Sequence, residues 1–330
     1  MKAILVTRYG GPEVLQVKEV PTPLAKENEV LLKIHAVAVN NTDPVFRKGK
    51  PFISRIFTGL LRPKHAIPGD VLAGEVIEIG KNVTNFKIGD RVYGYTTDTL
   101  GAHAEYICLP DDSAVTIIPE NISYESAAGI VDGGHTALVF LRDKGEIRNN
   151  QKVLIYGASG SIGTAAVQLS CSYGAEVTGV CSTTNIEMIK SLGVKRAIDY
   201  TKIDFTQENI KYDIIFDTVA KKSFSQCKNV LKENGVYLTT FPTLGIVLKG
   251  LFQVKRKGKR ALFTAAGMKP ANEKTENLQY ISELLKEDKI KTVISKRYSM
   301  DDVAEAHRYV ETGHKVGNVI MYVSNVKSSI

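Results

Sequence analysis

The stretch Lys152–Gly163, KVLIYGASGSIG, constrains the fold more than any other part of this 330-residue chain. It begins with a short apolar run that is typical of a strand buried on both faces of a parallel sheet. Three glycines follow at three-residue spacing, and the segment after them, rich in small residues, favours a helix. A strand, a glycine turn and a helix present free backbone N–H groups and a positive helix end to a phosphate. The stretch therefore predicts a dinucleotide-binding unit.

The three glycines have separate predicted roles in that unit. One permits the tight turn, one lets the backbone approach a pyrophosphate, and one lets the helix pack against its strand. The motif departs from strict G-x-G-x-x-G because Ala158 stands at the first glycine. The predicted pyrophosphate contacts are the residues of the loop itself: Gly157, Ala158, Ser159, Gly160, Ser161, Ile162 and Gly163.

Strand and helix patterns alternate on the C-terminal side of this unit. Such alternation predicts a doubly wound parallel sheet of the Rossmann type, in an α/β protein. A helix is expected to begin at Ser123, as a capping serine, and to break at Gly133-Gly134. The predicted strands are 176–181, 196–199, 213–217, 235–240 and 261–264, and the predicted helices are 185–192, 222–231, 273–287 and 301–312.

The first part of the chain has a different pattern, with short β-rich segments between turn residues and no strong helical period. We expect a β-rich, partly barrel-like domain there, and a last strand at 318–323 that returns to it. A chain of 330 residues also suits two domains. The predicted division is 1–123 with 269–330 for the β-rich domain and 124–268 for the dinucleotide-binding domain.

Composition excludes several classes of protein. The chain is 43% hydrophobic and 24% charged, and it has no apolar run long enough to cross a bilayer. Its start lacks the pattern of a signal peptide, so we expect a cytoplasmic protein with no membrane partner. The net charge is +8, but we interpret the basic run Lys255–Arg260 as a solvated loop and expect no nucleic-acid partner. The four cysteines show neither metal-clip nor disulfide spacing.

Further motifs identify a family. They include VAVNNTD at 37–43, PGDVLAGEV at 68–76, GAHAEY at 101–106 and DIIFDT at 213–218. With the glycine loop they make the chain resemble the medium-chain dehydrogenase/reductase superfamily, in its zinc-less, quinone-oxidoreductase-like branch of NADPH:quinone reductases. The resemblance implies a GroES-like β-rich catalytic domain made from both chain ends, around a Rossmann domain. It also implies a homodimer.

Zinc ligands are missing where zinc-dependent members of that superfamily have them. The position of one ligand cysteine is Asn40 here, and the position of the histidine is Asp70. An amide and a carboxylate suit zinc less well than a thiolate and an imidazole. The four-cysteine structural-zinc loop is also absent from the sequence. We therefore expect no metal, and polarisation of a carbonyl by protein donors or by the cofactor.

The end of the second strand of the Rossmann domain indicates which cofactor binds. NAD-binding folds place an acidic residue there for the ribose 2′-hydroxyl, and this chain has none at 182–185. Hydroxyls and an amide can donate to a 2′-phosphate instead, which favours NADP(H). The expected contacts are Ser182, Thr183 and Asn185, with Tyr200 implied by the resemblance. The hydroxyls of Ser182 and Thr183 could at the same time cap the helix predicted at 185–192.

The resemblance also implies residues near the reacting atoms. It places Asn40, Asp43 and Thr136 beside the nicotinamide or the substrate, while Thr240, Phe241 and Asn318 are expected near the nicotinamide ring. Asn40 is a candidate donor to a substrate oxygen, but it could also be a turn residue. Asp43 could instead take part in a turn or pair with Arg47. Thr136 could serve as a helix cap.

Two histidines and a tyrosine are weaker candidates for a functional role. We interpret His35, on an apolar strand, as a core residue, and His135 as packed against its neighbours rather than as a proton donor. Tyr95 is better explained as a buried aromatic anchor than as a donor.

The favoured function is an NADPH-dependent, zinc-independent reductase of quinones or of activated enones and enals, by hydride transfer from the nicotinamide C4. Three alternatives stay open at this point. The first is a zinc-type alcohol dehydrogenase, which predicts turnover that a chelator abolishes. The second is an NADPH-binding protein with a structural or regulatory role and little turnover. The third is a nucleic-acid binder, which predicts salt-dependent retention on DNA or RNA.

Overall fold

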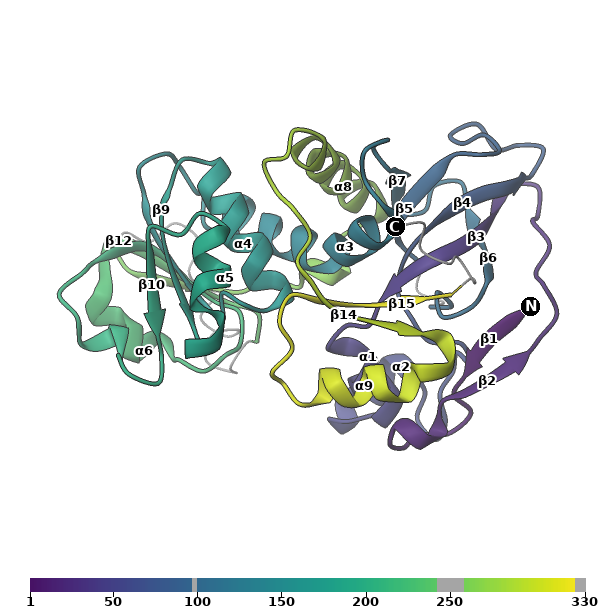
Figure 1. Cartoon of the computed structure of the whole chain (residues 1–330), viewed down its shortest axis with the longest axis horizontal. Helices are drawn as coiled ribbons and strands as arrows, with labels where there is room; N and C mark the ends of the chain where they lie inside the picture. The colour runs from purple at the N-terminus through teal and green to yellow at the C-terminus, as the bar shows by residue number, and fades with distance from the viewer. Residues whose placement is uncertain (97–99, 242–257, 324–330) are drawn as a thin grey trace. The chain divides into compact units, whose positions relative to one another are not determined.

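The computed structural model describes residues 1–96, 100–241 and 258–323, and the chain divides into two compact units (Figure 1). Unit 1 comprises Met1–Val131, Pro270–Lys286 and Thr292–Ile330, and unit 2 comprises Asp132–Lys269 and Glu287–Lys291. Among the described residues, no helix is both long and apolar enough to span a membrane.

Unit 2 is built on a six-stranded parallel sheet with the order β10-β9-β8-β11-β12-β13. The chain starts in the middle of the sheet, runs outward to β10, and then resumes at β11 on the other side of β8. This is the doubly wound arrangement that the sequence predicts. The strands are β8 (Lys152–Tyr156), β9 (Glu176–Cys181), β10 (Arg196–Asp199), β11 (Tyr212–Asp217), β12 (Leu231–Thr239) and β13 (Arg260–Leu262).

Helices pack on this sheet: α4 on β8 and β9, α5 on β10, and α6 on β12 (Figure 1). A buried cluster that includes Leu154, Tyr237 and Cys227 of α6 packs on this sheet. Burying such side chains stabilises a fold by about 1.5–3 kcal/mol each. The helices are α3 (Tyr124–Leu138), which enters unit 2 from unit 1, α4 (Ser161–Ser172), α5 (Ile186–Ser191) and α6 (Phe224–Cys227).

The helix that begins after Ser123 corrects one prediction. Its start is confirmed, because the Ser123 hydroxyl accepts from the Ser126 N–H at 3.2 Å. The predicted break at Gly133-Gly134 is wrong, since α3 runs through both glycines and continues as a π-helical turn, Val139–Lys144. A Cβ on Gly133 would lie 2.6 Å from the Ser161 hydroxyl. The glycine therefore permits close packing against α4 rather than ending the helix.

The predicted helix 222–231 is also shorter in the structure. Ser223 and Gln226 form a capping box that starts α6, and a 3₁₀ turn then leads to Val230. Leu231 already pairs with Tyr212 as the first residue of β12. The buried Leu231 side chain favours this earlier start of the strand.

Unit 1 holds a seven-stranded, mostly antiparallel sheet and a separate β1-β2 hairpin. β3 is its centre, because it pairs with β4, with β6 and, from the other end of the chain, with β15. The β-rich first domain with a returning C-terminal strand is therefore confirmed. The strands are β1 (Lys2–Leu5), β2 (Gln16–Glu19), β3 (Glu29–Ala38), β4 (Val71–Ile79), β5 (Arg91–Tyr95), β6 (Tyr106–Pro110), β7 (Val115–Ile117), β14 (Ile294–Ser299) and β15 (Asn318–Tyr322).

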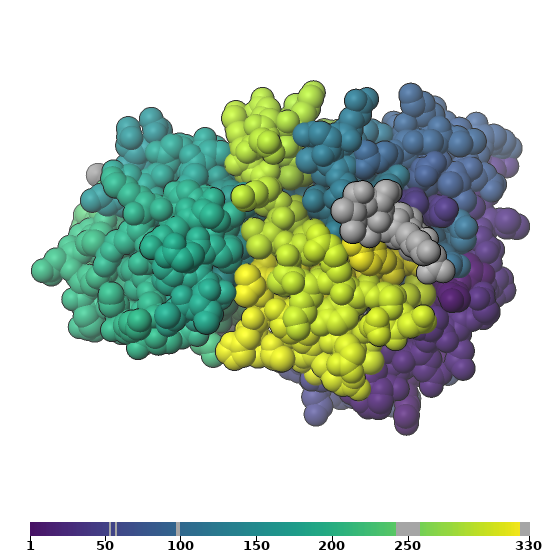
Figure 2. Space-filling model, in the orientation of Figure 1, coloured from purple at the N-terminus to yellow at the C-terminus, as the bar shows by residue number. Residues whose placement is uncertain are grey.

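The C-terminal segment packs against the N-terminal segment within unit 1, as the yellow and purple atoms of Figure 2 show. Apolar residues from both ends, among them Val39, Leu72, Val303 and Met321, share one buried core. The helices of this unit, besides the start of α3, are α1 (Thr42–Lys48), α2 (Arg55–Thr58), α8 (Ala271–Lys286) and α9 (Val303–Glu311).

Candidate functional site

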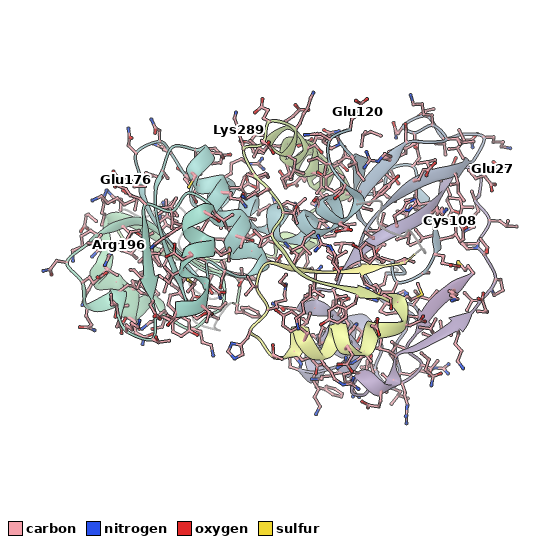
Figure 3. The ribbon with its side chains drawn as sticks, viewed as in Figure 1. Glu27, Cys108, Glu120, Glu176, Arg196 and Lys289 are labelled. Carbon is pink, nitrogen blue, oxygen red and sulfur yellow. The ribbon has the colours of Figure 1, made fainter. Side chains whose placement is uncertain are left out.

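The predicted cofactor residues of unit 2 gather at one edge of the parallel sheet. Each group directly follows the carboxyl end of a strand: the glycine loop follows β8, residues 182–185 follow β9, Tyr200 follows β10, and Thr240 follows β12. Ligands of doubly wound sheets bind outside these ends, where the strand order reverses. Figure 3 labels Glu176 and Arg196, the first residues of β9 and β10, which mark the opposite edge.

The three glycines of the loop differ in their surroundings, as their separate predicted roles require. Gly157 has a φ of +81°, which favours glycine in the turn. A Cβ on Gly163 would lie 2.0 Å from the Gly157 carbonyl oxygen, so only glycine lets α4 pack this closely on β8. A Cβ on Gly160 would meet only that same oxygen, at 3.6 Å, so the outer side of the loop is open.

The first turn of α4 supplies hydrogen-bond donors at this open side. Its N-cap is Gly160, and no side chain caps the helix. The first N–H groups of a helix have no partner within the helix, and the macrodipole makes this end positive. The loop and the helix end therefore fit a pyrophosphate.

The turn after β9 is tied to the glycine loop through one amide. Asn185 Nδ2 donates to the Ser159 hydroxyl at 3.2 Å and to the Ser182 hydroxyl at 3.1 Å. The additional role of Ser182 as a helix cap is wrong, because neither Ser182 nor Asn185 makes a capping side-chain hydrogen bond. These polar groups therefore surround the place where a dinucleotide ribose is expected.

A carboxylate that the sequence analysis missed lies beside this turn. Asp199, the last residue of β10, is aligned with Cys181, the last residue of β9. Its Oδ2 accepts from the Thr183 hydroxyl at 2.5 Å, and its Oδ1 accepts from the Thr201 N–H at 2.9 Å and the Thr201 hydroxyl at 2.7 Å. The hydrogen bond from Thr183, followed by those from Thr201, lowers the pKa of Asp199 to about 2. The carboxylate is therefore charged at neutral pH.

The remaining candidates of unit 2 lie directly after β12 and on α3. Thr240 donates to the Thr218 carbonyl at 3.3 Å, and Phe241 is 59% exposed. Thr136 is buried on α3. His135, its neighbour, is fully buried with Nε2 3.0 Å from the Ala266 carbonyl oxygen, which agrees with a packed histidine.

Asn40 is the main candidate site residue of unit 1. It follows β3, only 2% of its surface is exposed, and its Nδ2 has no hydrogen-bond partner among the described residues. Its backbone N–H donates to Asp43 Oδ2 at 2.6 Å. This contact agrees with the interpretation of Asp43 as a turn residue. Asp43 therefore fixes the backbone that carries the Asn40 amide.

The guanidinium of Arg47 pairs with Glu311, and its Nε donates to the Gly10 carbonyl at 3.2 Å. The Arg47 side chain is 1% exposed. Lys48 adds an exposed contact to the same carboxylate at 3.1 Å. These bonds join α1 to α9 and so hold the segment that follows Asn40.

Other candidates of unit 1 have structural contacts. Asn318 Nδ2 donates to the Val293 carbonyl at 3.1 Å, and the Tyr95 hydroxyl donates to the Val131 carbonyl at 3.3 Å. Tyr95 is the buried anchor that we expected. His35 is packed but not fully buried: its side chain is 13% exposed, and its ring stacks on that of Tyr124 with the centroids 4.3 Å apart.

The described residues contain no group of three or more His, Cys, Asp or Glu side chains that could hold a metal ion. The thiols do not suggest a nucleophile either. Burial raises the pKa of Cys181, at the end of β9, to about 11, so the thiol is protonated at neutral pH.

A doubly wound parallel sheet with a glycine loop at its strand reversal, together with a β-rich unit made from both chain ends, defines a dinucleotide-binding oxidoreductase fold. Comparisons with known proteins narrow this class. Residues 26–120 match the family model of the alcohol dehydrogenase GroES-like domain, and residues 192–321 match that of the zinc-binding dehydrogenases.

Similar proteins cover nearly the whole chain. A 2-methylene-furan-3-one reductase of Solanum lycopersicum is 32% identical, over 98% of this chain and 79% of its own length. The chloroplastic NADPH-dependent alkenal/one oxidoreductase of Arabidopsis thaliana is 30% identical, with the same two coverages. The solved structure of the quinone oxidoreductase from Coxiella burnetii is 31% identical and superposes with a TM-score of 0.84, over 98% of this chain and 99% of that one. The chain therefore belongs to the medium-chain dehydrogenase/reductase superfamily, in its quinone-oxidoreductase branch.

Proposed function

We propose that the chain is an NADPH-dependent, zinc-independent oxidoreductase that reduces quinones or activated enones and enals. The observation that carries the proposal is the Asn40 amide, a buried donor whose Nδ2 has no partner among the described residues. An unsatisfied buried donor costs about 1–3 kcal/mol. A substrate oxygen would satisfy it, and the relatives named above reduce an enone, an alkenal or a quinone according to their names.

NADP(H), when bound, supplies a hydride from C4 of its nicotinamide. The glycine loop and the first turn of α4 would hold its pyrophosphate, and Ser182, Asn185 and Tyr200 would contact the adenosine end. The name of the Arabidopsis relative states NADPH dependence and supports this choice. Thr136, Thr240, Phe241 and Asn318 remain proposed neighbours of the nicotinamide.

Asn40 would act on the substrate by donating a hydrogen bond to the oxygen on which negative charge develops. A fixed donor in a buried position stabilises such a charge more than water does. Asp43 would act as a positioning residue, because its carboxylate holds the Asn40 backbone. In quinone reduction, the hydride and a proton give the hydroquinone. In enone reduction, the hydride adds to the β-carbon and a proton to the α-carbon.

Zinc independence is supported by the residues at the two ligand positions. Asn40 offers a neutral amide, and Asp70 offers a carboxylate, where zinc-dependent relatives have a thiolate and an imidazole. Asn40 then takes over the polarising role that a Lewis acid has in those relatives.

Three further points belong to the proposal. Residues 1–123 and 269–330 would form the catalytic domain and residues 124–268 the cofactor domain, which the two compact units support. A homodimer and a cytoplasmic location stay predictions.

A steady-state scan tests the proposal. Oxidation of NADPH and of NADH is measured with phenanthrenequinone and with an α,β-unsaturated ketone, each with and without a chelator. We expect NADPH-dependent turnover that the chelator does not change. Absence of turnover with both acceptors, or its loss on chelation, would contradict the proposal.

A further inference from the structure

The turn after β9 presents fewer donors than its sequence indicates. A threonine hydroxyl has one proton, and the proton of Thr183 is donated to Asp199 at 2.5 Å. A carboxylate only accepts, so the direction of this hydrogen bond is fixed. Thr183 therefore faces a ligand as an acceptor, although its position at the end of β9 suggests a donor to a 2′-phosphate.

Asp199 also brings a negative charge close to the turn after β9. Its register with Cys181 puts the carboxylate beside the end of β9, although it belongs to β10. It is 9% exposed, and the Thr201 N–H and hydroxyl occupy its other oxygen. A ligand hydroxyl therefore finds both carboxylate oxygens already hydrogen-bonded, unlike the free carboxylate of an NAD-specific site. A phosphate still meets the negative charge, which Lys202, with its Nζ 3.6 Å from Oδ2 and an exposed side chain, offsets only in part.

We propose that Asp199, acting through the Thr183 hydroxyl, is a selectivity-determining residue that keeps the preference for NADPH over NADH small. The inference rests on the proposed function. Ser182 and Tyr200 favour a 2′-phosphate as donors, whereas the Asp199–Thr183 pair opposes it by charge and by offering only an acceptor. Both N–H groups of Asn185 are already donated, to Ser159 and to Ser182. An acceptor suits the 2′-hydroxyl of NADH, which can donate to Thr183.

The variant Asp199→Asn reverses the direction of the hydrogen bond between residues 183 and 199. The new amide donates to the Thr183 oxygen, which releases the Thr183 proton toward the ligand, and the charge is removed. A hydrogen bond to a charged group is worth a factor of ten or more in affinity. We expect the Kd of NADPH to fall about tenfold and the Kd of NADH to change less than about twofold.

The variant Thr183→Val acts on the same pair from the other side. It removes the O–H that covers Asp199 Oδ2 and leaves the charge in place. We expect the Kd of NADPH to rise about fivefold or more. The Kd of NADH should change little, because the uncovered Asp199 Oδ2 can accept from the 2′-hydroxyl in place of Thr183. The two variants therefore shift the ratio of the two affinities in opposite directions, which loss of packing or of folded protein would not do.

Isothermal titration calorimetry of the full chain with NADPH and with NADH, in the absence of an acceptor, measures these ratios without turnover. Asp213→Asn is the matched control. It removes one carboxylate from β11 of the same sheet, where Asp213 pairs with Lys232 at 2.7 Å, and it should leave the ratio unchanged. If Asp199→Asn does not fold, Thr183→Val alone still tests the inference through the ratio of the two Kd values. Thr183→Ser keeps the hydroxyl and is expected to show the wild-type ratio.

The inference is overturned if both variants shift the ratio in the same direction, if neither shifts it more than about twofold, or if Asp213→Asn has the same effect. If the wild type binds and oxidises NADPH but neither variant changes the ratio of the two Kd values, this inference is wrong and the proposed function stands. A chain that binds neither dinucleotide would remove both.

Discussion

The glycine loop of unit 2 and the Asn40–Arg47 segment of unit 1 are built in different ways. The loop is made of backbone: its shape depends on positions where a Cβ would collide, and its donors are N–H groups of its own helix. The Asn40–Arg47 segment is made of side chains, and its anchoring ion pair joins Arg47 to Glu311, 264 residues away.

The difference shows in what each region tolerates. A backbone site needs a few glycines and little else, so one added methyl group can abolish it. In a site made of side chains, the loss of one partner weakens the site only in part, because the remaining contacts still hold the segment. The following predictions test this contrast, from the largest expected effect to the smallest.

Gly163→Ala should have the largest effect. Its Cβ would lie 2.0 Å from the Gly157 oxygen and 2.8 Å from the Ala158 backbone, so the loop must move. We expect about 1–3 kcal/mol less stability and loss of measurable dinucleotide binding in calorimetry. In Gly160→Ala the nearest atom is 3.6 Å from the Cβ, so stability should hold while binding weakens. Equal stability of the two variants would contradict the assigned glycine roles.

Arg47→Met should come next, because it leaves the partly buried Glu311 without its main partner. Breaking a buried ion pair costs about 3–5 kcal/mol, which urea unfolding measures. Lys48→Met is the control, since Lys48 pairs with the same carboxylate from an exposed position. It should change stability by less than about 1 kcal/mol. Similar losses in both variants would show that burial of Arg47 does not anchor α1.

Asn40→Ala should reduce kcat about a hundredfold and leave the Kd of NADPH unchanged. The reason is that the variant removes the donor to the substrate oxygen and leaves the sequence of the glycine loop unchanged. Asn277→Ala, which alters another buried asparagine of unit 1, is the control. It should cost stability but not the rate per folded molecule. A rate for Asn40→Ala near that of the wild type would refute the role given to Asn40.

Acid should weaken unit 1 through two buried histidines. His103 and His307 are fully buried, and their rings stand perpendicular to each other with the centroids 6.2 Å apart. No ring nitrogen of either has a hydrogen-bond partner among the described residues. Burial lowers the pKa of His103 to about 4, and burial, His103 and Arg47 lower that of His307 well below its usual value.

The sign of the pH effect follows from these shifts. Both rings are neutral when folded, but they take up protons near pH 6.5 when unfolded, so stability is complete above about pH 6.5. It should fall toward pH 4 by about 1.4 kcal/mol per pH unit for each histidine. Urea unfolding at several pH values checks this, and His103→Phe should flatten the slope. Parallel curves for variant and wild type would contradict the assignment.

Local signals explain what could be predicted from the sequence. The bounds of β9 and β10 agree with the predicted segments, because each is a short β-rich run between turn residues. The glycine loop was equally predictable, since its geometry depends on its own few residues.

Elements that depend on distant partners were missed. β14 has a mostly exposed, polar sequence and is held by backbone pairing to β15, so it lacks an apolar pattern. α1 contains Pro44, which suggests a turn, but a proline is tolerated in the first turn of a helix. Asp199 was overlooked because only the parallel register places it beside the end of β9.

A single-turnover reaction tests the central claim most directly. The chain is first loaded with NADPH in chelator-containing buffer, and the loss of nicotinamide absorbance is followed after phenanthrenequinone or an enone is added. The account predicts a rapid decay in the wild type, and in Asn40→Ala a decay about a hundredfold slower from an equally loaded complex. Bound NADPH that persists in the wild type with both acceptors, or that decays equally fast in both proteins, would contradict it.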